Sequence, residues 1–122
     1  MENRAQKYHR ERRSEALREE ITSLVEGELE DPRVDLVTVN EVQLDPGGKV
    51  ARVFVSAEGT DDEVAVSMEA LNASRGFIRH ALTVNLGLRH APELVFVLDQ
   101  AEKYGNRVEE LLQRIERRKR HN

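Results

Sequence analysis

LNASRGFIRH, the stretch from Leu71 to His80, lies inside a region whose apolar residues keep a helical spacing. Ser74 and Gly76 interrupt that region, and glycine within a helix costs about 1 kcal/mol relative to alanine. The stretch therefore predicts two helices separated by a kink at Ser74. The Ser74 side chain is expected to cap the second helix, which begins at Arg75.

The kink is a candidate binding site for an anion. The beginning of a helix presents unpaired N–H groups and the positive end of the helix dipole. Arg75, Arg79 and His80 lie within or just after the kink, and no acidic residue occurs from Ala70 to Pro92. These residues predict a phosphate-binding kink, and an ordinary break that folds two helices over a sheet is the alternative.

Phe77 and Ile78 follow the kink on the apolar face of the second helix, so both are expected in the core. Platforms for base stacking need exposed rings, and the chain has no Trp, two Tyr and three Phe. Any RNA recognition is therefore expected to depend on RNA shape and backbone, with an affinity that falls as salt rises.

A β-hairpin is predicted before the kink. Residues 34–44 are rich in β-branched residues, and their apolar phase changes partway, which indicates a β-bulge near Asn40-Glu41. Asp45-Pro46-Gly47-Gly48 is typical of a turn. Residues 50–57 then alternate between apolar and polar side chains, as in a half-buried strand.

The remaining elements follow from periodicity and stop signals. Asp31-Pro32 ends the first helix, because the residue before a proline is disfavoured in the α region. The unbroken apolar run 94–98 predicts a strand covered on both faces or lying centrally. The predicted helices are 4–29, 61–73, 75–86 and a last amphipathic helix that contains Val108, Leu111, Leu112 and Ile115, preceded by a loop from Asp99 to Asn106.

This order (α-β-β-α-kink-α-β plus a C-terminal helix) predicts an α+β two-layer domain, with three strands and helices on one face. A length of 122 residues suits one domain, 1–122. A right-handed crossover is expected if the second and third strands are parallel neighbours. A monomer is expected, because one small core uses the apolar positions.

The charges are segregated along the chain, although the net charge is −4. Residues 26–69 hold twelve acids against three cations, whereas both ends and the stretch from Ala70 to Pro92 are basic. Such segregation fits a protein that approaches a polyanion with one face, and solvated helix faces are the alternative. The basic tail from about residue 116 is expected to be a disordered electrostatic anchor or a solubilising end.

Several classes of function find no support in the sequence. There is no cysteine, and the four histidines have no ligand spacing, so no metal site or cofactor is expected. Neither a nucleophile–base pair nor a P-loop is present, which argues against an enzyme. No apolar run reaches membrane-spanning length, and a cytoplasmic protein without membrane contact is expected.

Particular segments resemble the bacterial ribosome-binding factor A (RbfA) family, whose fold is of the type II KH kind. They are Asp31-Pro32-Arg33, Ala51-Arg52-Val53-Phe54-Val55-Ser56, Gly76-Phe77-Ile78-Arg79, and Leu88-Arg89 with Pro92-Glu93-Leu94-Val95-Phe96. The family has an Ala-x-Gly kink, and here Ser74-Arg75-Gly76 replaces the alanine with serine. Serine is small, so the kink is expected to persist.

The resemblance implies an assembly factor that binds the free 30S small subunit and assists late maturation and processing of 16S rRNA, including at low temperature. Assembly GTPases are further expected partners. The expected RNA-binding residues are Ser74, Arg75, Gly76, Arg79, His80 and Arg89, with Arg4, Lys7, Arg10 and Arg13 from the first helix. Two alternatives stay open: a KH protein that binds another RNA, and a protein-interaction module that uses the acidic middle of the chain.

Overall fold

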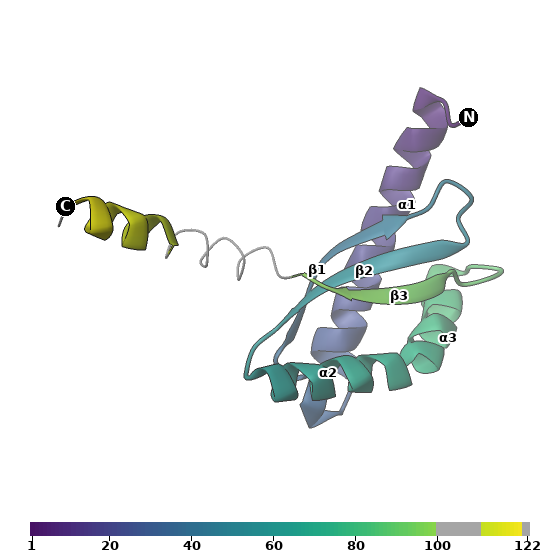
Figure 1. The fold of residues 1–122 in the computed structure, drawn as a ribbon. Coiled ribbons are helices and arrows are strands. Elements are labelled where there is room, and N and C mark those ends of the chain that lie inside the picture. The colour runs from purple at the N-terminus through teal and green to yellow at the C-terminus, as the bar shows by residue number, and fades with distance from the viewer. Residues whose placement is uncertain (100–110, 121–122) are drawn as a thin grey trace.

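A computed structural model describes residues 1–99 and 111–120, and Figure 1 shows its fold. One sheet has the strand order β1-β2-β3, with β1 antiparallel and β3 parallel to the central strand β2. The predicted α+β fold and its order of elements are confirmed. The elements are α1 (Arg4–Ser23), a π-helical turn (Leu24–Glu28), a 3₁₀ turn (Pro32–Val34), β1 (Val37–Leu44), β2 (Val50–Ala57), α2 (Asp61–Ala73), α3 (Arg75–Leu86) and β3 (Glu93–Leu98).

The first helix begins and ends where local chemistry requires. Asn3 and Gln6 form a reciprocal capping box at its start. The α-helical pattern ends at Ser23, and a π-helical turn then carries the chain to Glu28. Asp31 accepts a hydrogen bond from the backbone N–H of Arg33, which opens the short turn at Pro32. The predicted stop at Asp31-Pro32 is therefore confirmed.

The bulge predicted in the first strand is confirmed, because the register of β1 against β2 shifts between Val39 and Glu41. This extra residue lets Val37, Val39, Val42 and Leu44 all point into the core. The predicted start of the strand at Val34 was wrong. Val34 is buried, but it belongs to the 3₁₀ turn that follows Asp31.

The hairpin turn is held by one carboxylate. Asp45 Oδ1 accepts hydrogen bonds from the backbone N–H groups of Lys49 at 2.7 Å and Val50 at 2.9 Å. Gly48 adopts a positive φ of 72°, a backbone conformation that favours glycine. The N–H of Val50, followed by that of Lys49, lowers the pKa of Asp45 below its ordinary value.

Asp45 is expected to contribute to stability against acid. Its pKa is lower in the folded chain than in the unfolded chain, so its contribution is fully present above about pH 4. The contribution is lost as the pH falls through the folded-state pKa. Thermal unfolding between about pH 2 and 6 checks this: Asp45→Asn is expected to flatten the acid side of the profile. Asp35→Asn, at an exposed position outside the hairpin, is the control, and an equal flattening there would contradict the assignment.

The two central helices have well-defined outer ends. Thr60 Oγ1 accepts from the N–H of Glu63, and the Glu63 carboxylate accepts from the N–H of Thr60, which completes a capping box at the start of α2. Gly87 ends α3 in the left-handed conformation with φ 63°. The predicted bounds of these helices, 61–73 and 75–86, are confirmed.

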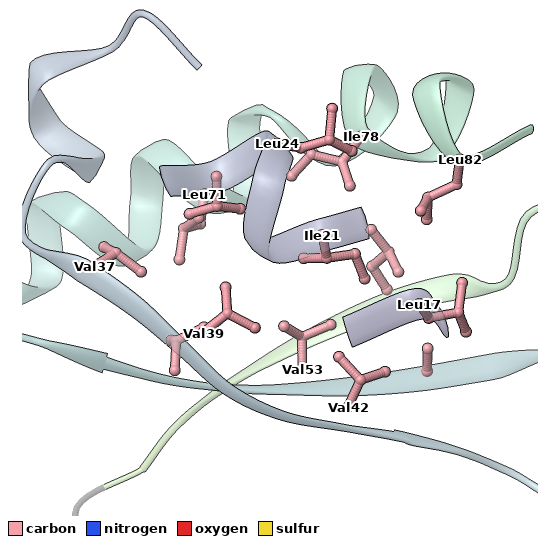
Figure 2. Close-up of a cluster of buried hydrophobic side chains, with 14 of the residues drawn as sticks. Leu17, Ile21, Leu24, Val37, Val39, Val42, Val53, Leu71, Ile78 and Leu82 are labelled. Carbon is pink, nitrogen blue, oxygen red and sulfur yellow. The ribbon is translucent and has the colours of Figure 1, made fainter. Parts of the chain in front are cut away.

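The core lies between the helices and one face of the sheet. Figure 2 shows Ile21 among side chains of the sheet, such as Val53, and of the central helices, such as Leu71 and Ile78. Ser14 links α1 to β1 by hydrogen bonds: its hydroxyl donates to the carbonyl of Arg10 and accepts from the N–H of Leu44. Within residues 1–99 and 111–120, no helix has the length and apolar character needed to cross a membrane.

The third strand lies at the edge of the sheet, so its predicted double-sided burial was wrong. Leu94 is buried against the helices, whereas Val95 on the opposite face is 45% exposed. The apolar run thus reflects one covered face and one open face. A monomer was expected on the premise that one core uses every apolar position. That premise is wrong for Val95 and for further exposed apolar side chains, including Leu36, Val66, Phe77 and Val84.

Residues 111–120 are helical, with Leu111, Leu112 and Ile115 about half exposed. The expectation of a disordered tail from about residue 116 was therefore wrong for residues 116–120, which continue the helix. Of the loop predicted from Asp99 to Asn106, the structure describes Asp99 alone. Val108, which was predicted to be helical, also lies outside the described residues.

Candidate nucleic-acid interface

The kink is a single residue between two helices. Ser74 ends α2 with its N–H bonded to the carbonyls of Ala70 and Leu71, and its own carbonyl accepts from the N–H of Ile78 in α3. The predicted side-chain cap was wrong. The Ser74 hydroxyl donates back to the carbonyl of Ala70 at 3.0 Å, and no side-chain hydrogen bond caps α3. The hydroxyl is therefore engaged with the end of α2 and not with the start of α3.

The first turn of α3 is open to solvent. Arg75, Gly76 and His80 are all exposed, and Arg75 Nε makes one hydrogen bond of 3.3 Å to the carbonyl of Asn72. Apart from its two chain neighbours and the backbone of its own helix, no atom of the described residues would lie within 4 Å of a Cβ built on Gly76, and the φ of Gly76 lies outside the region that requires glycine. Neither local packing nor φ requires glycine at this position, so a partner can approach the backbone closely.

Arg79 has a different environment from Arg75. Its side chain is partly buried: Nε donates to the carbonyl of Pro92 at 3.0 Å and Nη2 donates to the carbonyl of Ala91 at 3.1 Å. Arg79 therefore connects the middle of α3 to the loop that leads into β3. Pro92 is buried, whereas Arg89 and His90 in the same loop are exposed. The guanidinium thus holds the loop that presents Arg89.

The N-terminal cations form a separate group. Arg4, Lys7 and Arg13 are exposed on α1, whereas Arg10 pairs with Glu2 and donates to the carbonyl of Leu44. This hydrogen-bonded pair lowers the pKa of Glu2 and raises that of Arg10. Arg10 thereby ties the start of α1 to the hairpin.

The two groups of cations lie at different ends of α1. The contact between α1 and α3 includes a hydrogen bond of 2.7 Å from Asn85 to Glu20. Glu20 is ten residues beyond Arg10, which is about 15 Å along a helix. Figure 1 likewise shows the start of α1 far from the kink. The ten predicted residues therefore do not form one site. Arg79 connects α3, which begins at the kink, to the loop with Arg89, and we call the kink, Arg79 and this loop the kink face.

Phe77 was expected in the core, and this was wrong. Its side chain is 54% exposed, whereas the next residue, Ile78, is fully buried. Helical periodicity alone places both residues near the apolar face. The orientation of α3 against the sheet turns Ile78 and Leu82 inward (Figure 2). The same orientation leaves Phe77 at the surface.

Comparisons with known proteins agree with this fold. A family model described as ribosome-binding factor A matches residues 9–112. A ribosome-binding factor A from Koribacter versatilis is 56% identical over 119 residues, which cover 98% of this chain and 97% of that protein. One from Thermomicrobium roseum is 39% identical over 109 residues, covering 89% of this chain and 84% of that protein.

Solved structures give the same result. The crystal structure of ribosome-binding factor A from Thermus thermophilus matches with a TM-score of 0.67 and 27% identity, covering 75% of this chain and 97% of that one. A homology model of the T. thermophilus factor, fitted into a cryo-EM map of a 30S–RbfA complex, matches with a TM-score of 0.59 and 29% identity, covering 71% and 91%. The family model spans most of this chain, and the first relative is more than half identical along almost its whole length. The chain therefore belongs to the ribosome-binding factor A family.

Proposed function

We propose that this protein binds the free 30S ribosomal subunit in the cytoplasm and contacts 16S rRNA through the kink face. The observation that carries the proposal is the charge of that face. Arg75, His80 and Arg89 are exposed there, and the chain has no acid from Ala70 to Pro92. Family membership supports the same proposal, since a related factor has been fitted into a map of a 30S complex.

The proposed contact is with the RNA backbone. Arg75 and Arg89 supply positive charge, and the open backbone at Gly76 admits a phosphate close to the first turn of α3. Arg4, Lys7 and Arg13 form a second contact, separated from the first along α1. The protein acts as a monomeric single domain, 1–122, without catalysis of its own. Its binding assists late maturation and processing of 16S rRNA, including at low temperature, and assembly GTPases act on the same particle.

Removing two cations from the kink face is expected to weaken binding to 30S subunits. For the double variant Arg75→Ala with Arg89→Ala, the slope of log affinity against log salt concentration is expected to become shallower by about 1 for each phosphate contact removed. Co-sedimentation with purified 30S subunits at several salt concentrations measures this. Lys49→Ala with Arg52→Ala is the matched control, because it removes two exposed cations elsewhere. An equal loss in both pairs would mean that only net charge matters.

A second candidate function is protein interaction through the acidic middle of the chain. A groove of about 300 Å³ is lined by Leu36 and Val66, which are 50% and 44% exposed, and by the acids Glu58, Asp62 and Glu63. Arg33 also lines it and pairs with Asp31. An acidic rim repels RNA and suits a basic segment of an assembly GTPase or a ribosomal protein. Sucrose-gradient sedimentation of lysate separates the two functions. A complex that survives nuclease, tolerates loss of Arg75 and Arg89, and is lost in Glu58→Lys with Asp62→Lys would favour this candidate.

A further inference from the structure

The exposed face of α3 carries an aromatic ring beside the kink. Phe77 is 54% exposed, and His80, one turn later, is exposed as well. Residues three apart on a helix lie on the same face, so the ring and the imidazole are neighbours. Val84, two turns beyond Phe77, is 65% exposed. Exposure of this apolar area to water is unfavourable in free energy, and a partner that covers the ring removes that cost.

The charges around the ring favour an anionic partner. Arg75 is the first residue of α3, two residues before Phe77 and therefore on another side of the helix, and the chain has no acid from Ala70 to Pro92. Among the acids of α2, Asp61, Asp62 and Glu63 lie at the opposite end of that 13-residue helix from the kink. The exposed Glu69 lies five residues before Ser74 and interacts electrostatically with Arg33. The hydrogen bond from Asn85 to Glu20 lies at the far end of α3. An anion can therefore reach Phe77 without meeting a neighbouring acid in the kink segment.

The space around the ring suits a flat ligand. Gly76 precedes Phe77, and a Cβ built on this glycine would meet no atom of the described residues within 4 Å beyond its chain neighbours and the backbone of its own helix. Interfaces between proteins concentrate their energy in clusters of large anchors, whereas this face offers one aromatic side chain. A nucleobase has an apolar face that matches one ring, and the phosphates on either side of it match the N–H groups of His80 and the charge of Arg75 at the start of the helix.

We propose that Phe77 is a stacking platform for a single unpaired RNA base, with His80 beside it and Arg75 available to the phosphate chain at the start of the same helix. This inference rests on the proposed function and adds the chemical class of the group that the kink face recognises. Helical RNA buries the faces of its bases, so the partner is a loop, bulge or strand end from which one base is displaced. The contact tolerates any base, because every base has a π-face.

Three substitutions of Phe77 test the stack against purified 30S subunits. Phe77→Ala is expected to lower affinity roughly 5- to 150-fold, the range for loss of one stacked base. Phe77→Leu is expected to lower it nearly as much, since leucine keeps apolar area but has no π-face. Phe77→Trp is expected to retain the affinity of the native chain. Stacking involves no ion release, so Phe77→Ala leaves the salt slope unchanged.

The Phe77→Trp variant also reports on the stack directly. The native chain has no Trp, so the indole emission of this variant is unique within the protein. Quenching of that emission on addition of 30S subunits is expected if a base stacks on the ring. Unchanged emission at saturating subunits, with binding intact, would overturn the proposal. Circular dichroism is expected to show native folding in all three variants, because the side chain lies at the surface.

Val84→Ala is the control for a docking protein helix. A protein that covers the apolar face of α3 would make Val84→Ala costly and would accept leucine at position 77, and that pattern overturns the stacking proposal. Failure of the proposed function is distinguishable from this. If the native chain does not bind 30S subunits, or if losing Arg75 and Arg89 has no effect, the RNA-binding function itself fails. If the native chain binds 30S subunits and loses affinity without Arg75 and Arg89, but Phe77→Ala binds normally, only the stacking proposal fails.

Discussion

Replacing Ile21 with alanine is expected to lower the free energy of unfolding by about 2–5 kcal/mol, the range for truncating a buried isoleucine to alanine. Ile21 is fully buried in the cluster that joins α1 to the sheet and to the central helices. Its loss removes apolar contacts and leaves a cavity that rigid neighbours on three sides fill only in part. Small domains are stable by about 5–15 kcal/mol, so this single change threatens folding at physiological temperature.

Urea unfolding followed by far-ultraviolet circular dichroism measures the effect, since the chain has no Trp. Ile115→Ala makes the same chemical change at a side chain that is 48% exposed, and it is expected to alter the free energy by less than about 0.5 kcal/mol. If the two variants lose equal stability, Ile21 does not lie in the tightly packed centre of the domain.

Arg79→Ala is expected to lower the free energy of unfolding by about 1.5–3 kcal/mol, the range for hydrogen bonds made by a charged group. It removes both donors to the carbonyls of Ala91 and Pro92, and Pro92 is buried. The loop before β3 then loses these hydrogen bonds to α3, and Arg89 in that loop becomes less well positioned. Affinity for 30S subunits is therefore expected to fall along with stability.

Arg79→Lys separates charge from geometry at this position. Lysine keeps the positive charge but lacks the planar group that reaches two carbonyls together, so it is expected to recover only part of the stability. Arg75→Ala is the matched control: its side chain is exposed, with one long hydrogen bond, and stability is expected to stay within about 0.5 kcal/mol. Full recovery of affinity by lysine, with stability unchanged in Arg79→Ala, would make Arg79 a direct RNA contact instead.

Features governed by neighbouring residues could be predicted from the sequence. The stop at Asp31-Pro32, the turn held by Asp45, the start of α2 and the end of α3 at Gly87 all appear where expected. Each depends on a cap, a restricted φ or a short hydrogen bond between residues a few positions apart. The bulge near Asn40 was also predictable, because a change of apolar phase in a buried strand requires an extra residue.

Contacts between elements could not be predicted in this way. Periodicity marked an apolar side of α3, but only the packing of that helix on the sheet decided that Ile78 is buried and Phe77 exposed. The residues of the kink were named, yet the partners of Arg79 lie twelve and thirteen positions away in a loop that the fold brings back to α3.

For this protein, sequence by itself determined the order of elements, most of their boundaries and the acid-free segment that contains the kink, because short-range sterics, hydrogen bonding and charge act within a few residues. Tertiary structure alone decided that β3 is an edge strand, that the N-terminal cations lie apart from the kink, and which cation holds a loop and which faces solvent. Those outcomes depend on how the helices are oriented against the sheet, and that orientation is set by the whole core and not by any one segment.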